Sequence, residues 1–295
     1  MASVNPIDVV AVQGYSGLES LVVEVDKLVS LPDIYYRLEE TIIDPTSTVE
    51  VISNLLRSDP DLCARMLSMA NSAFYSFPTR VETIERAVST IGLRQIRELV
   101  LVTAVVKAFE GIPPGTVNME TFWEHSLAVG IMARKLGQQA GLPDADGYYI
   151  PGMLHDIGRL VMYLKLPALM HELLNRHDAE GRSLFLLERE VLDYTHADIG
   201  ARLLELWKLP RSIWEPVGKH HDPGQSHEYQ LAACAIHLAD AWVNTHQVGR
   251  SGDGSELMID EVALYRIDIE SEQISEIGQA AKLQTREVAR LFMNH

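Results

Sequence analysis

Apolar residues recur every three or four positions along most of the chain, which is the spacing of one face of an α-helix. The segment VEVISNLLR, residues 49–57, follows this spacing, and Ser47 or Thr48 before it can cap the first helical turn. The two-residue alternation typical of a half-buried β-strand is not sustained anywhere, and no internal repeat or heptad array is present. The pattern therefore predicts an all-α fold.

Capping and helix-breaking residues divide this pattern into successive helices. Asp59 can cap a helix whose first turn holds Pro60, because the N–H that proline lacks has no partner there. Gly92 separates two helices, and Asn118 can cap a helix that ends near Gly141. The pattern predicts further helices at about 147–164, 168–177, 183–207, 211–219, 228–246, 258–266 and 271–293.

The clearest boundary is the segment EGIPPGTVN, residues 110–118, because its Pro-Pro-Gly sequence at 113–115 cannot continue a helix. We expect two helical lobes and an extension, over residues 18–117, 118–248 and 249–295. The polar stretch GRSGDGSE, residues 249–256, predicts a mobile loop within the extension.

The composition is that of a folded protein with an excess of acidic groups. The chain has 295 residues, of which 47% are hydrophobic, and its formal net charge is −16. This charge repels phosphate groups at long range, so we expect no binding to nucleic acid or to a membrane. The sequence shows neither an export signal nor a membrane span. Cys63 and Cys234, the two cysteines, are too few and too far apart for a disulfide framework, which indicates a reducing, cytoplasmic location.

A series of seven polar residues in the second lobe has the chemistry of metal ligands. It consists of His125, the pair His155 and Asp156, His196, the pair His220 and His221, and Asp240. Each element lies on or at the end of a different predicted helix, so a helical bundle can point all of them toward one centre. Imidazole nitrogen and carboxylate oxygen suit iron, manganese, zinc or nickel, and two divalent ions can share one bridging carboxylate.

The adjacent pair His155 and Asp156 places a condition on this site. Consecutive helical residues point about 100° apart. Both side chains can therefore reach the same ion only at a helix end or a local distortion; otherwise they reach two different ions.

Each of these histidines also has a structural alternative. A single histidine on an apolar helix face is more often a hydrogen-bonded core residue than a ligand. We expect His237 to pack in the core. The remaining histidines lie in polar surroundings and are expected to be solvated: His171, His177, His227, His246 and His295. No single histidine favours metal binding over a structural role. The spacing of the whole series does favour metal binding.

The sequence resembles a known family in both lobes. The segments EHSLAVGIMARKLG, GMLHDIGRL, THADIGARLLELWKLP, GKHHDP and IHLADAW resemble, in this order, the motifs of the HD superfamily of metal-dependent phosphohydrolases, which includes the HD-GYP branch. In the first lobe, DPDL, ANSAFY and AVSTIGLRQIREL resemble the front half of the HDOD (HD-related output domain) family. The resemblance covers roughly residues 25–245 and implies a two-lobed bacterial signalling module with an HD-like helical bundle. Many HDOD proteins have lost the HD ligands, whereas this chain keeps them.

The resemblance also implies roles for individual residues. It identifies the series as metal ligands: His125, His155, Asp156, His196, His220, His221 and Asp240. Arg159 stands where many active members have lysine, and its guanidinium can meet a phosphate. Two positions depart from the pattern. GQSHEYQ follows HHDP in place of the GYP signature, which does not support cyclic di-GMP hydrolysis, and Thr121 occupies the place of an active-site glutamate.

Two functions remain open at this point. In the first, the chain is a signal-transduction module that works with a signalling protein partner, and its HD-like lobe binds metal or a regulatory ligand. In the second, it is a metal-dependent phosphohydrolase of a nucleotide or another phosphate ester. There, two divalent ions activate water and polarise a phosphoryl oxygen, and Asp156 and Arg159 are catalytic. The front lobe and the missing GYP signature favour regulation, whereas the intact ligands favour metal and permit catalysis.

Overall fold

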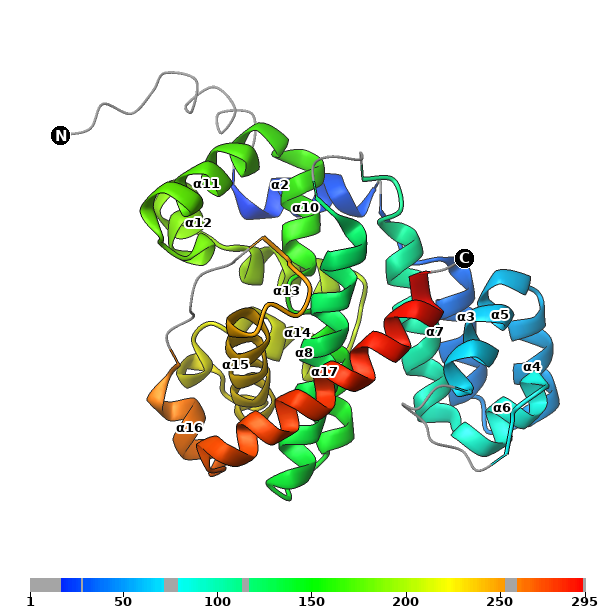
Figure 1. The fold of residues 1–295 in the computed structure, drawn as a ribbon. Helices are drawn as coiled ribbons and strands as arrows, with labels where there is room; N and C mark the ends of the chain where they lie inside the picture. The colour runs from blue at the N-terminus through cyan, green and yellow to red at the C-terminus, as the bar shows by residue number, and fades with distance from the viewer. Residues whose placement is uncertain (1–16, 28, 72–78, 113–116, 253–258, 294–295) are drawn as a thin grey trace. The chain divides into compact units, whose positions relative to one another are not determined.

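The structure, a computed structural model, describes residues 17–27, 29–71, 79–112, 117–252 and 259–293 (Figure 1). Every regular element in these ranges is helical, so the predicted all-α fold is confirmed. Several helices begin at the predicted caps. The side chains of Thr48, Asp59 and Asn118 each accept a hydrogen bond from a backbone N–H in the first turn that follows. The Pro-Pro-Gly break at 113–115 lies outside the described residues.

The described residues divide into two units by their internal contacts. The smaller unit comprises the described residues of Val29–Gly111 and Leu283–His295. Its core includes Leu38, Leu56 and Ile96, which have no exposed surface. Its helices within Val29–Gly111 are α3 (Asp33–Ile43), α4 (Val49–Arg57), α5 (Pro60–Ala70), α6 (Ile84–Ile91) and α7 (Leu93–Ala108).

The larger unit comprises the described residues of Met1–Leu28 and Ile112–Lys282, and it holds all seven candidate ligands. Its first helices are α2 (Leu18–Asp26), α8 (Met119–Gln139), α9 (Tyr149–Leu154), α10 (Ile157–Lys165) and α11 (Pro167–Glu180). They are followed by α12 (Leu184–Leu192), α13 (His196–Leu206), α14 (Arg211–Lys219), α15 (Gln230–Thr245), α16 (Glu261–Ile267) and α17 (Ser271–Met293), whose residues up to Lys282 belong to this unit.

Two helices form the centre of the larger unit. Every residue of α8 from His125 to Ala133 is buried, and so is every residue of α15 from Ala232 to Asn244. Helices that are buried on all sides keep their few polar side chains away from water. His125 on α8 and Asp240 on α15 are therefore inside the unit and must find partners there.

Two predicted helices are broken in the structure. The helix expected over 147–164 is divided between α9 and α10, and the break falls at His155 and Asp156. The helix expected over 183–207 is divided between α12 and α13. There Asp193 adopts a left-handed backbone conformation (φ 64°), and Thr195 caps the next helix. Both breaks fall at or next to candidate ligands, and both redirect the chain.

Candidate metal centre

The structure brings all seven candidate ligands together. His125 comes from α8 and Asp240 from α15. His196 is the first residue of α13, while His220 and His221 directly follow α14. His155 is the C-cap residue that follows α9, and Asp156, with φ −97° and ψ 8°, precedes α10. The pair therefore lies at a helix break, where neighbouring side chains are free of the 100° spacing of a continuous helix.

Close helix crossings set these positions. A Cβ atom on Gly152 of α9 would lie 2.9 Å from Cα of Gly130 on α8, so the helices that carry His155 and His125 touch through glycine. A Cβ atom on Gly158 of α10 would overlap the carbonyl oxygen of His196 on α13. Glycine at these positions lets the backbones approach closely, and the ligands next to them converge as a result.

We call His125, His155 and Asp240 the first cluster. Nε2 of His125 lies 3.1 Å from Oδ1 of Asp240 and 3.4 Å from Nε2 of His155. Nε2 of His155 is in turn 3.5 Å from the same Asp240 oxygen. One donor atom from each residue lies within 4.8 Å of the other two, so all three can bind one ion.

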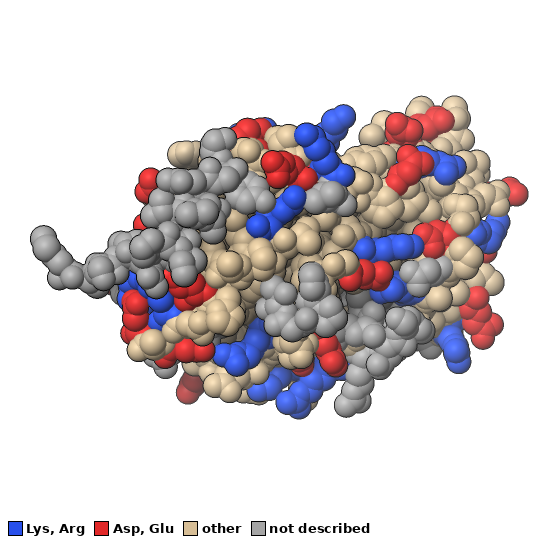
Figure 2. Space-filling model, turned by 90° about the horizontal axis from the view of Figure 1, so that it is seen from above, with Lys and Arg blue, Asp and Glu red and all other residues tan. Residues whose placement is uncertain are grey.

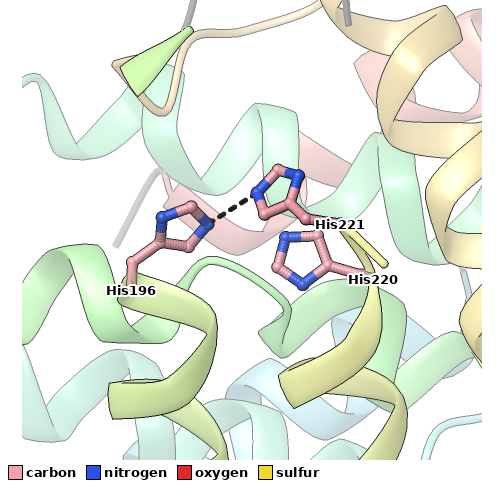
Figure 3. Close-up of side chains that lie close together, drawn as sticks. All are labelled: His196, His220 and His221. Atoms are coloured by element: carbon pink, nitrogen blue, oxygen red, sulfur yellow. Dashed lines mark hydrogen bonds between the residues drawn. The ribbon is translucent and has the colours of Figure 1, made fainter. Parts of the chain in front are cut away.

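We call His196, His220 and His221 the second cluster (Figure 3). Nε2 of His221 lies 3.0 Å from Nε2 of His196, and the rings of His220 and His221 have centroids 4.0 Å apart. Figure 3 shows the three imidazoles facing one another from two segments of the chain. Their donor atoms also lie within 4.8 Å of one another.

Asp156 lies between the two clusters. Its Oδ2 is 3.3 Å from Nε2 of His155 in the first cluster, and its Oδ1 is 3.1 Å from Nε2 of His196 in the second. The two oxygens of one carboxylate thus face different clusters. This is the arrangement expected of a carboxylate that bridges two metal ions.

Partners on Nδ1 orient three of the imidazoles. Nδ1 of His155 donates to the carbonyl oxygen of Gly152 at 2.8 Å, and Nδ1 of His220 donates to that of Val217 at 2.6 Å. Nδ1 of His196 donates to a carboxylate oxygen of Glu188 at 2.6 Å. In each ring the Nε2 atom then faces the centre, as in metal-binding histidines, whose other nitrogen usually donates to a carbonyl or a carboxylate.

Burial and neighbouring charges shift the pKa values of several residues of the centre. Burial, together with the charges of His155 and His196, lowers the pKa of His220 to about 3. Burial favours the neutral form of Asp156, but Arg159 and His155 hold its pKa well below its usual range. Burial also opposes protonation of His155, but Asp156 and Asp240 raise its pKa to about 10. The centre therefore combines an ionised carboxylate, a neutral imidazole and a proton on His155 that a bound cation would replace.

A buried atom in the second cluster supports the fit to metal. Among the described residues, Nε2 of His220 has no hydrogen-bond partner, although the side chain has no exposed surface. Buried polar atoms in folded proteins nearly always have a partner. A neutral imidazole with a free Nε2 lone pair, directed toward two other histidines, has the chemistry of a ligand to iron, manganese, zinc or nickel.

Residues 248–252, which we call the covering segment, close one side of the centre. Gly249 packs against the backbone of Thr121 and His125, and the N–H of Arg250 donates to the carbonyl oxygen of Thr121 at 2.9 Å. Ser251 has no exposed surface. Residues 249–252 thus contact the rest of the unit, and the mobile loop expected over 249–256 stays a prediction; residues 253–256 lie outside the described residues.

Arg159 is buried beneath the covering segment. Its side chain is 2% exposed, its Nε lies 3.2 Å from Oδ1 of Asp156, and its Nη1 lies 3.4 Å from Oγ of Ser251. The hydroxyl of Tyr163, one helical turn along α10, donates to the carbonyl oxygen of Ser251 at 3.2 Å. In this conformation, therefore, the Arg159 guanidinium faces an aspartate and the covering segment.

The structure also corrects the sequence interpretation at two other residues. His177, expected to be solvated, is buried, and its Nδ1 donates to the carbonyl oxygen of Arg182 at 2.7 Å. Glu188, which contacts His196, was not predicted. On a continuous helix over 183–207, Glu188 and His196 would be separated by about 12 Å along the helix axis. The sequence THAD, residues 195–198, did contain the signal, because Thr195 and Asp198 form a capping box that starts a new helix.

Among the helices of the described ranges, none combines the length and the apolar character that crossing a bilayer requires.

Comparison with known proteins identifies relatives of this chain. A model of the HDOD domain matches residues 28–223. An uncharacterized protein of Treponema pallidum is 25% identical over 226 residues, which are 75% of this chain and 43% of that protein. Ribonuclease Y of Acholeplasma laidlawii is 24% identical over 266 residues, 86% of this chain and 44% of that protein. The chain thus spans less than half the length of these relatives.

Solved structures share the fold over nearly the whole chain. An HDOD domain protein of unknown function from Geobacter sulfurreducens superposes with a TM-score of 0.79 at 24% identity, covering 94% of this chain and 97% of that one. A Shewanella amazonensis protein provisionally named a phosphohydrolase superposes with a TM-score of 0.71 at 26% identity, covering 92% of this chain and 97% of that one. A Marinobacter aquaeolei protein provisionally named for signal transduction gives 0.74 at 20% identity, covering 96% and 64%.

Proposed function

The chain belongs to the HDOD domain family, and from this premise we propose that it is a signal-transduction module whose larger unit binds two divalent transition-metal ions. The smaller unit receives or transmits the signal, and a signalling protein is the partner. Two free cysteines suit a reducing compartment, and we place the module in the cytoplasm.

The observation that carries this proposal is the position of Asp156 between two three-residue clusters. Seven ligand side chains exceed the four to six positions of one ordinary transition ion, so a carboxylate shared by two ions accounts for the set better than one crowded site. Iron, manganese, zinc and nickel all suit these nitrogen and oxygen donors.

A regulatory role is favoured over catalysis by the burial of the centre. Of the seven ligand residues, only His221 is more than slightly exposed; Asp156 and Asp240 are 2% and 3% exposed, and the other four have no exposed surface. Arg159, the residue that would meet a phosphate, is buried beneath the covering segment. A ligand that meets the Arg159 guanidinium would have to displace the covering segment, which is the behaviour of a regulated element.

Hydrolysis of a nucleotide or another phosphate ester is the second candidate function. It is favoured by the shared carboxylate, because two neighbouring ions are a common arrangement in phosphoesterases. When bound, the ions would supply Lewis acidity to such a substrate. In this function Asp156 would be a ligand at both metal positions, and Arg159 would neutralise charge on the phosphoryl group.

Metal analysis tests the proposal. Protein from cells grown with iron, manganese, zinc and nickel should be purified without chelator or immobilised-metal resin and analysed by elemental mass spectrometry. We expect about two ions per chain in wild-type protein and fewer than one in Asp156→Ala. If wild-type protein contains none of the four metals after such growth and also fails to take them up by dialysis, the proposal is wrong.

A further inference from the structure

Glu188, on α12, occupies an unusual position beside the second cluster. Its side chain has no exposed surface. One oxygen, Oε2, accepts two hydrogen bonds from the same residue: from the backbone N–H of His196 at 2.8 Å and from its Nδ1 at 2.6 Å. Glu188 therefore fixes both the first turn of α13 and the orientation of the imidazole that this turn carries.

Glu188 also distinguishes His196 from the other oriented imidazoles. The Nδ1 atoms of His155 and His220 donate to backbone carbonyl oxygens, whereas that of His196 donates to a carboxylate. A carboxylate holds the proton on Nδ1 and leaves the lone pair on Nε2, as a carbonyl does. Its negative charge in addition makes the imidazole a stronger electron donor toward a cation at Nε2.

The burial of Glu188 is consistent with a role toward a cation. An ionised carboxylate sealed from water is stable only when positive charge or hydrogen-bond donors face it. Among the described residues, its second oxygen, Oε1, has no hydrogen-bond partner, and both donors to Oε2 belong to His196. A cation bound to Nε2 of His196 would therefore compensate the negative charge of Glu188 through the imidazole ring between them.

We propose that Glu188 is a positioning residue that orients His196 and strengthens metal binding at the second cluster, while the first cluster binds its ion without it. This inference rests on the proposed function, since it requires that the centre bind metal. It predicts that the two metal positions can be separated by a change at a residue that touches neither ion.

The test is the variant Glu188→Gln. Glutamine has nearly the same shape, and its side-chain oxygen can still accept from both N–H groups of His196, so the fold is retained while the negative charge is lost. Mn²⁺ and Zn²⁺ binding should be measured separately by competition with a chromophoric chelator, and bound metal by elemental mass spectrometry. We expect one of the two affinities to fall by about 10- to 100-fold, as for other partners of metal-binding histidines. The other affinity should not change.

The matched control is Glu190→Gln on the same helix. Glu190 is exposed and pairs with Arg176 and Arg182, so this variant makes the same chemical change without contact to the centre. We expect wild-type affinities for both ions. Unfolding measured in excess chelator distinguishes a purely structural role of Glu188 from a role in metal binding. A purely structural role would lower the stability of Glu188→Gln and leave both metal affinities unchanged.

Three outcomes overturn the inference in distinguishable ways. If wild-type protein and Glu188→Gln bind two ions with the same affinities, Glu188 does not position His196 for metal, and the proposed function stands. If Glu188→Gln loses both ions equally, the two metal positions are not independent. If wild-type protein binds no metal, the proposed function is wrong and the inference falls with it.

Discussion

Replacement of Asp156 by asparagine is the change that separates a metal centre from a buried polar network. Asparagine keeps the size of the side chain and removes its charge. In wild-type protein the carboxylate lies 3.3 Å from Nε2 of His155, 3.1 Å from Nε2 of His196 and 3.2 Å from Nε of Arg159. All four side chains are at most 3% exposed, so the variant removes one negative charge from among buried cationic groups.

The expected loss of stability has two parts that can be measured separately. In excess chelator the variant lacks one partner of a buried ion pair, which costs on the order of 3–5 kcal/mol. With free metal at a hundred times the dissociation constant, each bound ion stabilises the wild-type fold by about 2.7 kcal/mol. Two ions therefore add about 5 kcal/mol, which for a unit of this size corresponds to a rise of about 10–20 °C in Tm. Because Asp156 contributes to both positions, the variant should gain only a small part of this.

The assay is thermal unfolding of wild-type protein and Asp156→Asn, each in chelator and in Mn²⁺ or Zn²⁺. His171→Ala is the control, because His171 is an exposed histidine of α11, whereas His177 is buried and would itself affect stability. We expect a large metal-dependent rise for wild type and for the control, and a small one for Asp156→Asn. An equal rise in the variant would show that Asp156 bridges no ions. No rise in wild type would show that the seven residues form a hydrogen-bonded network only.

Three further predictions concern packing, pH and the surface. Gly158→Ala should push α10 away from the His196 carbonyl group, which should lower stability by about 1–3 kcal/mol and reduce the amount of bound metal. An unchanged Tm and metal content would contradict the close contact of α10 with α13. Burial favours the neutral form of the Glu215 carboxyl group, but hydrogen bonds from the Ser226 side chain and the backbone N–H groups of 227–229 lower its pKa from 4.5 to about 2. This depressed pKa adds stability above pH 4.5 that is lost as the pH falls toward 2, so the difference in unfolding free energy between wild type and Glu215→Gln should shrink over that window; a constant difference would refute the assignment. The chain has a formal net charge of −16, and on the face shown in Figure 2 Lys and Arg side chains are interspersed with Asp and Glu. Random duplex DNA should therefore not be retarded in a gel at physiological salt, and salt-dependent retardation would contradict this.

The elements that the sequence predicted correctly depend on local physics. The helical spacing of apolar residues and the caps at Thr48, Asp59 and Asn118 act within a single turn, so they can be recognised without knowledge of the rest of the chain. The seven candidate ligands could be recognised as a group for a related reason. Histidine and aspartate inside apolar helices need partners, and their order along the chain matched a known set of motifs.

The parts that were missed are not visible in the apolar periodicity of the chain. Apolar periodicity continues through both helix breaks, so it could not show that α9 ends at Leu154 or that α12 ends at Leu192. The contact between Glu188 and His196 exists only because the second break turns the chain back. The role of Gly158 is likewise invisible in the sequence, where it is one glycine in an apolar helix, until α13 is placed against it.

The enclosure of the centre links the fold to the choice between the two functions. Buried side chains in a close-packed interior hold their positions well, which suits the proposed metal binding, whereas the burial of Asp156 and Arg159 leaves little of either side chain open to a phosphoester. Arg159 and Tyr163 both lie within hydrogen-bonding distance of Ser251, so the residues that a phosphate would displace belong to the covering segment itself. A ligand that reaches Arg159 must therefore break these contacts, and its binding free energy is coupled to the position of the covering segment. That coupling is what a regulatory module requires, and an enzyme built on the same centre would have to overcome it in every turnover.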